Sequence, residues 1–114
     1  MYRFHVNVFG PPFSCTWEQT AAALEALPRM IFEPDGSFVV SGGVGPDRWQ
    51  VDGHLFDFDN RLHRLELHGQ CPPEAFDELL ACVGWPAESL SFELVREGVT
   101  LEEAAFRQRL TMQP

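Results

Sequence analysis

The sequence contains no lysine, and its only strongly basic residues are eight arginines. Seventeen aspartates and glutamates outnumber them, so the formal net charge at pH 7 is -9. Proteins that bind nucleic acids neutralise phosphates with a basic surface, and anionic membranes likewise attract basic segments. The composition therefore argues against nucleic acid and membrane as partners. A protein partner, if there is one, is expected to be basic.

Cysteine is also scarce, and the three residues present (Cys15, Cys71 and Cys82) are an odd number without CxxC spacing. This spacing predicts neither a disulfide framework nor a thiolate zinc site, and free thiols are typical of a reducing cytosol. The N-terminus lacks the apolar segment of a signal peptide, and no apolar run approaches the ~18 residues of a membrane span. We therefore expect a cytoplasmic protein.

The chain has no internal repeat, low-complexity tract or long linker that would divide it. Its 114 residues are 45% apolar and include ten phenylalanines. A chain of this size and composition can bury one proper hydrophobic core. We predict a single domain over residues 1–114.

Hydrophobic alternation and turn residues predict the strands. In the first segment, for example, Phe4, Val6 and Val8 share one side and Arg3, His5 and Asn7 share the other. The predicted β segments are a strand at 2–9, a hairpin at 30–40, a long hairpin at 49–68 and a strand at 89–95. The Gly-rich segment 41–47 is predicted to be a connecting loop.

Three helices are predicted from apolar spacing and capping residues. The first lies within 15–28, where Thr16 and Gln19 can form a capping box. The second lies within 71–86, opened by two prolines and ended by Gly84. The third covers 100–110, where Thr100 and Glu103 match a second capping box.

The predicted order is β-α-β-β-β-β-α-β-α, which indicates an α+β domain. Half-polar strands are typical of an antiparallel sheet with one face on helices and the other facing solvent. We therefore predict a two-layer sandwich. Its sheet has about six strands, and the two main helices lie on one face, together with a short C-terminal helix. The same order is compatible with a ferredoxin-like arrangement carrying an inserted hairpin.

The long hairpin has two possible registers. Val51, Leu55, Leu65 and Leu67 all point to the core only if the turn contains an odd number of residues. Either Phe58–Asn60 or Asp59–Arg61 supplies a three-residue loop. The two loops lead to different cross-strand pairs, and the sequence leaves the choice between them open.

The Asp59–Arg61 loop leads to the register that pairs His54 with Glu66 and Asp52 with His68, which are unlike groups. The Phe58–Asn60 loop has the better turn chemistry, but its register opposes Asp52 and Glu66, which is an unfavourable like-charge pair. In both registers His63 is predicted on the core side.

Several polar residues are expected to gather on the solvent-facing side of the sheet if the first strand lies beside the long hairpin. They are His5, Asp52, His54, Glu66, His68 and Glu93. Histidine and carboxylate side chains bind Zn²⁺ or another divalent transition metal, so His5, His54 and His68 form the hypothetical ligand set. Cross-strand charge pairing is the simpler interpretation of the same residues, and it needs no cofactor.

Other motifs point to no reaction. The segment from Asp57 starts like a calcium loop but has Leu62 and His68 where an EF-hand needs Gly and Glu. The glycine-rich segment lacks the Lys-Ser/Thr of a P-loop. Cys15 precedes a helix, but only His5 could be its base. Trp49 borders the glycine loop and is a candidate for an exposed aromatic contact.

Two functional hypotheses follow. The first is a small acidic module without catalytic activity, similar in character to immunity or adaptor proteins. It would bind a protein, or a second copy of itself, through the open sheet face and Trp49. The second is a metal- or small-ligand-binding domain that uses His5, His54 and His68. A C-terminal helix folded over that face would create a pocket and favour the second hypothesis, whereas a bare face favours the first.

Overall fold

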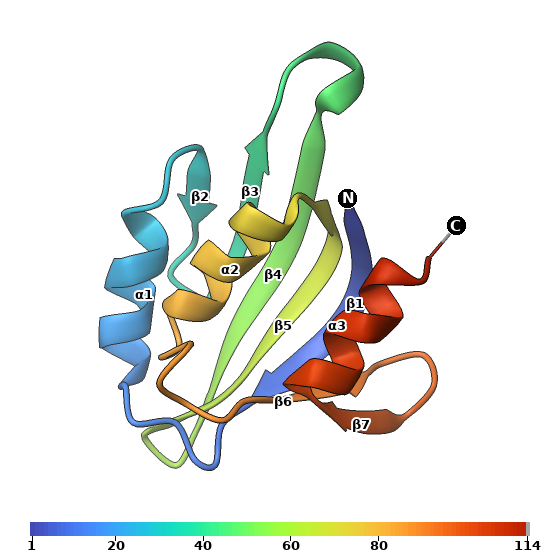
Figure 1. Ribbon diagram of the computed structural model, residues 1–114. Coiled ribbons are helices and arrows are strands. Elements are labelled where there is room, and N and C mark those ends of the chain that lie inside the picture. Colours follow the sequence, from blue (N-terminus) through green and yellow to red (C-terminus); the bar gives the residue numbers. More distant parts are fainter. Residues whose placement is uncertain (114) are drawn as a thin grey trace.

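The computed structural model describes residues 1–113 and shows an α+β protein built on one seven-stranded sheet (Figure 1). The strands are β1 (Tyr2–Phe9), β2 (Met30–Phe32), β3 (Ser37–Gly42), β4 (Trp49–Phe58), β5 (Arg61–Cys71), β6 (Ser91–Leu94) and β7 (Val99–Glu102). The helices are α1 (Trp17–Glu25), α2 (Pro73–Ala81) and α3 (Glu103–Thr111), with a 3₁₀ turn at Gly45–Asp47. The prediction of an α+β chain is confirmed, and the predicted number of strands is one too low.

The spatial order of the sheet is β2-β3-β4-β5-β1-β6-β7, and every neighbouring pair is antiparallel. The N-terminal strand β1 is therefore central, between β5 and β6. The condition for the expected cluster of polar residues, that the first strand lies beside the long hairpin, is met. His5 pairs with His68, and Asn7 pairs with both Glu66 and Glu93.

The helices pack on one face of this sheet. Phe76 of α2 lies 4.9 Å from the ring of Phe4, and Phe106 of α3 stacks on Phe92 at 4.5 Å. Leu24 of α1 is fully buried in the same core. The registers place Phe4 and Phe92 on the same side as Leu65, which is also fully buried. The alternating residues of the strands face the opposite side, which no helix covers.

Local sequence explains the first two helices. The Thr16 side chain accepts a hydrogen bond from the Gln19 backbone N–H, and the Gln19 side chain accepts one from the Thr16 N–H. The predicted capping box is thus confirmed. Pro73 opens α2, where a missing N–H costs no helical hydrogen bond, and Gly84 follows this helix with φ of 105°.

The start of the third helix was predicted wrongly. Thr100 does not cap it, because Val99–Glu102 forms β7 and pairs with β6, and α3 begins at Glu103. Pairing with an exposed strand edge satisfies the backbone groups of these residues, and this tertiary gain overrides the local capping signal.

The turn between β4 and β5 also differs from the prediction. Phe58 pairs with Arg61, so only Asp59 and Asn60 form the loop, with φ of 53° and 63°. Two residues in the left-handed region are typical of a type I′ turn, which matches the twist of the strands. The predicted three-residue loops are therefore wrong.

The core pattern requires one extra residue between the two strands, and this residue lies in a β-bulge instead of in the loop. Phe56 pairs with Arg64 and Asp57 with Leu62, which leaves His63 as the extra residue. Leu62 is buried, and His63 is exposed. The prediction that His63 faces the core is wrong, because the bulge turns its neighbour inward.

A gap in the core pattern at Gly53 has a steric explanation. A Cβ atom at this position would lie 2.0 Å from Cζ of Phe38, whose ring covers the glycine from the paired strand β3. Phe38 is 3% exposed and stacks on Phe32. The glycine thus makes room for an aromatic ring in the core.

The chain is compact, with a radius of gyration of 13.4 Å, as expected for one domain of this length. The first and last described segments lie side by side: the Arg3 N–H donates to the Gln113 side chain, which donates back to the Arg3 carbonyl. Within residues 1–113, no helix has the length and apolar character needed to cross a bilayer.

Candidate functional site

The face of the sheet opposite the helices, called the open face below, carries most of the candidate residues. It consists of the outward residues of the five strands β3, β4, β5, β1 and β6. Of the two registers considered for the long hairpin, the structure has the one that opposes unlike groups: Asp52 pairs with His68, and His54 with Glu66. This register avoids placing Asp52 directly opposite Glu66, a like-charge pair that would destabilise the sheet.

His5, Glu66 and His68 meet at the centre of the open face. The imidazole Nε2 of His5 lies 2.9 Å from a carboxylate oxygen of Glu66. The rings of His5 and His68 are stacked, 4.1 Å apart and 12° from parallel. Next to them, the Asn7 amide donates to Glu93 at 2.9 Å. The polar residues on this face are therefore paired mainly with one another.

His54 belongs to a different group. Its ring stacks on Phe56 at 4.1 Å, and the Arg64 guanidinium lies 3.8 Å from the centre of the same Phe56 ring. This contact turns His54 along its own strand, toward the β4–β5 turn. Asp52 accepts a hydrogen bond from the side chain of Gln50, at 3.2 Å.

Aromatic rings continue from this stack to the end of the hairpin. His63, in the bulge, contacts Phe9 edge-on with ring centres 5.7 Å apart, and lies 6.2 Å from Phe58. Phe58 is 73% exposed, which is unusual for a residue of this size. We name these residues the turn-end patch: Phe9, Phe56, Phe58, His63 and Arg64.

The hypothetical metal ligands do not converge. His54 packs on Phe56, whereas His5 is paired with Glu66 and stacked on His68. Across residues 1–113, no group of three or more His, Cys, Asp or Glu side chains is arranged to hold a metal ion. C-terminal helix α3 lies with the other helices and does not roof the open face, since Phe106 packs on Phe92 and Phe76.

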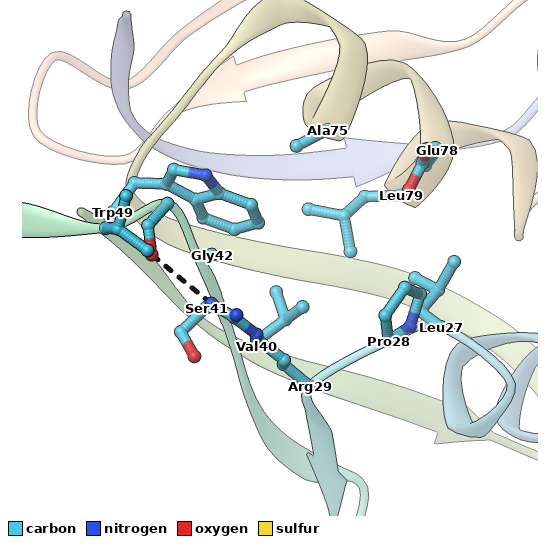
Figure 2. A pocket seen from close by; sticks show the side chains of 12 residues that line it. Leu27, Pro28, Arg29, Val40, Ser41, Gly42, Trp49, Ala75, Glu78 and Leu79 are labelled. Atoms are coloured by element: carbon cyan, nitrogen blue, oxygen red, sulfur yellow. Dashed lines mark hydrogen bonds between the residues drawn. The ribbon is translucent and has the colours of Figure 1, made fainter. Parts of the chain in front are cut away.

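Trp49 lies apart from the other candidates. It is half-buried on the helix side of the sheet, where it forms one wall of a cavity of about 290 Å³ between the end of α1, strand β3 and helix α2 (Figure 2). Leu27, Val40, Ala75 and Leu79 supply other walls. Trp49 and the histidines therefore belong to two separate surfaces.

Within residues 1–113, no histidine or carboxylate side chain forms a hydrogen bond with a cysteine sulfur. Burial raises the pKa of the Cys71 thiol to about 12 and that of Cys82 to about 11, which disfavours the nucleophilic thiolate. The Sγ of Cys15 accepts a hydrogen bond from the Thr20 hydroxyl. His5, the base considered for Cys15, is bonded to Glu66 on the other face.

Sequence reasoning missed the turn-end patch and the cavity. Phe56 and Phe58 follow His54 at alternate positions, so their place on the open face was predictable from periodicity. Their contacts with Arg64 and His63 were not, because those contacts depend on the bulge. The cavity joins three distant segments, and no local pattern signals it.

Comparison of the chain with protein-family models, curated proteins and solved structures finds no match.

Proposed function

We propose that this protein is a binding module without catalytic activity, and that it docks a basic protein on its open face. The observation that carries the proposal is the arrangement of the helices: all three pack on one face and leave the other bare. A bare face lacks the concavity typical of small-molecule sites, whereas it suits contact with another protein.

The composition of the turn-end patch supports protein recognition. Aromatic residues and arginine are enriched among the residues that contribute most to protein–protein binding. Phe58 is 73% exposed, and Phe56 and Arg64 are already packed on each other. Ordering such side chains before binding reduces the entropy lost in the complex.

The charge of the chain favours a basic partner over a second copy. Four carboxylates, Asp52, Glu66, Glu93 and Glu102, lie on the open-face positions of the strands, against the three arginines Arg3, Arg61 and Arg64. Two copies would bring together two chains of net charge -9. Association with a basic protein is attractive at long range and weakens as salt is added.

The proposal extends to architecture and location. We propose a two-layer, ferredoxin-like arrangement with the β2–β3 hairpin as the insertion. The central order β4-β5-β1-β6, with helices after β1 and β5, supports it. This likeness concerns the fold and carries no function. We propose a cytoplasmic location because all three cysteines are free.

The test compares the wild-type protein with two double variants as bait in a lysate of the source cells. Phe56→Ala/Arg64→Ala removes the stack on the open face. Arg109→Ala/Met112→Ala is the matched control, because it removes an arginine and a 75% exposed apolar side chain from the end of α3. Circular dichroism checks that all three proteins are folded.

We expect one basic protein to be captured by the wild type and the control, and at least tenfold less by the open-face variant. Capture should also fall as salt is raised from about 50 to 500 mM, because screening weakens exposed charge pairs. Equal capture by all three baits would contradict the proposal. Light scattering tests for self-association. If the wild type is a dimer and the Phe56→Ala/Arg64→Ala variant is a monomer, the open face binds a second copy of the chain and not a basic protein.

A further inference from the structure

The cavity at Trp49 is a second site, and it lies on the helix side of the sheet (Figure 2). Its volume of about 290 Å³ is near the lower limit of ligand pockets in proteins. At about 30 Å³ for each water-sized group, it has room for roughly ten non-hydrogen atoms. The walls formed by Leu27, Val40, Ala75, Leu79 and Trp49 are mainly apolar.

A glycine on the neighbouring strand makes this cavity possible. Gly42 pairs with Trp49, and a Cβ at Gly42 would lie 2.4 Å from Cζ2 of the indole. The ring therefore lies flat over the glycine and faces Leu79 across the cavity (Figure 2). Any larger residue at position 42 would displace the wall.

Trp49 differs from the other two tryptophans in how it is held. Trp17 donates its indole N–H to the Leu55 carbonyl, and Trp85 donates to the Glu103 carboxylate. Within the described part of the chain, the Trp49 indole N–H has no such acceptor. Packing therefore holds the ring, and its N–H is free to donate to an occupant of the site.

The rim of the cavity carries an arginine at a fixed place. Arg29 adopts a positive φ of 58°, and its Nη1 donates to the Gly43 carbonyl at 3.3 Å, the dashed line in Figure 2. A polar hollow of about 450 Å³ adjoins the cavity and shares Arg29, Gly42 and Trp49 with it. Arg48 lines the hollow as well, together with Gln50 and Gln70, so the hollow reaches the end of the open face.

The charge of this hollow is opposite to that of the whole chain. Acidic residues outnumber arginines by 17 to 8, yet the hollow is lined by Arg29 and Arg48 and, among the described residues, by no carboxylate. The one carboxylate at the apolar cavity, Glu78, lies on α2 on the side opposite Arg29 (Figure 2). An apolar cavity thus opens beside a positively charged hollow.

We propose that the two together bind a small anionic amphiphile. Its apolar chain fills the cavity against Trp49 and Leu79, and its carboxylate or phosphate head lies in the hollow near Arg29 and Arg48. Arginine suits this role because it stays charged and its planar guanidinium can hold both oxygens of such a head.

The test uses octanoate, which has ten non-hydrogen atoms, in isothermal titration calorimetry below its micelle concentration. Octyl phosphate distinguishes a phosphate head from a carboxylate head, and octyltrimethylammonium is the cationic control. We expect both anions to bind with one site per chain, at least tenfold more tightly than the cation. The tighter of the two anions then identifies the head group.

Variants separate the apolar and the charged parts of the site. Ala75→Leu fills the cavity from the half-buried side of α2 that lines it and should abolish binding. Arg29→Gln/Arg48→Gln should weaken octanoate at least fivefold, and Glu78→Gln should strengthen it slightly. Arg61→Gln, in the distant β4–β5 turn, is the matched control and should leave the affinity unchanged.

Three results would overturn the proposal: no heat of binding for either anion at millimolar concentration, equal or tighter binding of the cation, or undiminished binding by Ala75→Leu. Because Ala75→Leu is a modest change on a helix surface, its fold is checked by circular dichroism. If it does not fold, the shift of indole N–H signals in an NMR titration of the wild type decides whether Trp49 is the contact.

Discussion

The two faces of the sheet are built from the same strands, yet they differ in how their side chains are held. On the helix side, Val6, Leu65 and Phe92 are fully buried in one continuous core. On the open face, their neighbours His5, Glu66 and Glu93 make pairwise contacts at the surface. Burial holds the first set and pairing holds the second. This difference indicates that most of the stabilisation by burial resides on the helix side, and the open face is the one that we propose for recognition.

The largest difference in stability should come from replacing a phenylalanine by alanine on each of the two faces. Phe92→Ala removes a fully buried ring that stacks on Phe106, and should lower the free energy of unfolding by about 4 kcal/mol. Phe56→Ala on the open face should cost about 1 kcal/mol, since it loses only surface stacking. Urea denaturation measures both. Equal losses would contradict the assignment of stability to the helix side.

A smaller loss of stability is expected from a substitution of Gly53, the glycine on the core side of β4. Gly53→Ala places a methyl group against the ring of Phe38, which has no free space because it is buried and stacked on Phe32. Overpacking of this kind should cost about 2 kcal/mol. The control is Gly98→Ser, at a turn glycine where an added Cβ meets nothing within 4 Å. Its φ of 70° adds some strain, so its loss should be smaller but not zero.

Two arginines, Arg107 on the helix side and Arg64 on the open face, offer a third contrast. Arg107 joins α3 to α2 through Asp77 at 2.7 Å and pairs with Glu103 of its own helix at 2.8 Å, with its side chain 21% exposed. Arg107→Met should cost about 1.5 kcal/mol, because the carboxylates lose a charged donor. Arg64→Met on the open face should cost at most about 0.5 kcal/mol. Thermal unfolding of both variants checks the ranking, and a larger loss for Arg64→Met would reverse it.

A pH-dependent effect, small near neutral pH, concerns the buried thiol of Cys71 on the helix side. Its pKa rises from 9.0 to about 12 because burial disfavours the thiolate. An acid whose pKa is raised by folding stabilises the protein fully below its unfolded pKa, and this contribution declines as pH rises from there toward the folded pKa. Stability should therefore fall above pH 9, by at most about 1.4 kcal/mol per pH unit from this group.

The check on Cys71 is the slope of unfolding free energy against pH between 8 and 10.5. Cys71→Ala loses some stability at every pH because it leaves a cavity, but its slope above pH 9 should be shallower than that of the wild type. An unchanged slope would show that Cys71 ionises equally in the folded and unfolded chains.

Much of the fold was predictable from hydrophobic alternation. Phe4, Val6 and Val8 identified the core side of β1, and the capping box at Thr16 located α1. These signals are local, and the structure agrees with them. They were sufficient for the α+β class and for the two faces of the sheet.

The errors arose where two local patterns compete or where distant segments meet. Thr100–Glu102 could cap a helix or extend a sheet, and only the partner strand β6 decides between them. The bulge at His63 takes up one residue that was predicted to lie in the turn. The turn preferences of the residues do not indicate such a bulge. The cavity depends on Gly42 and Trp49 meeting Leu79 from α2, so it is visible only in three dimensions.

Site-specific photocrosslinking tests the central claim, that the open face is the docking surface, most directly. A photoreactive phenylalanine analogue replaces Phe58 on the open side or, as the matched control, the exposed Ala22 on α1. Both proteins are irradiated in lysate of the source cells. We predict one adduct with a basic protein from position 58, lost at high salt, and none from position 22. Adducts of the same protein from position 22 alone would contradict the claim.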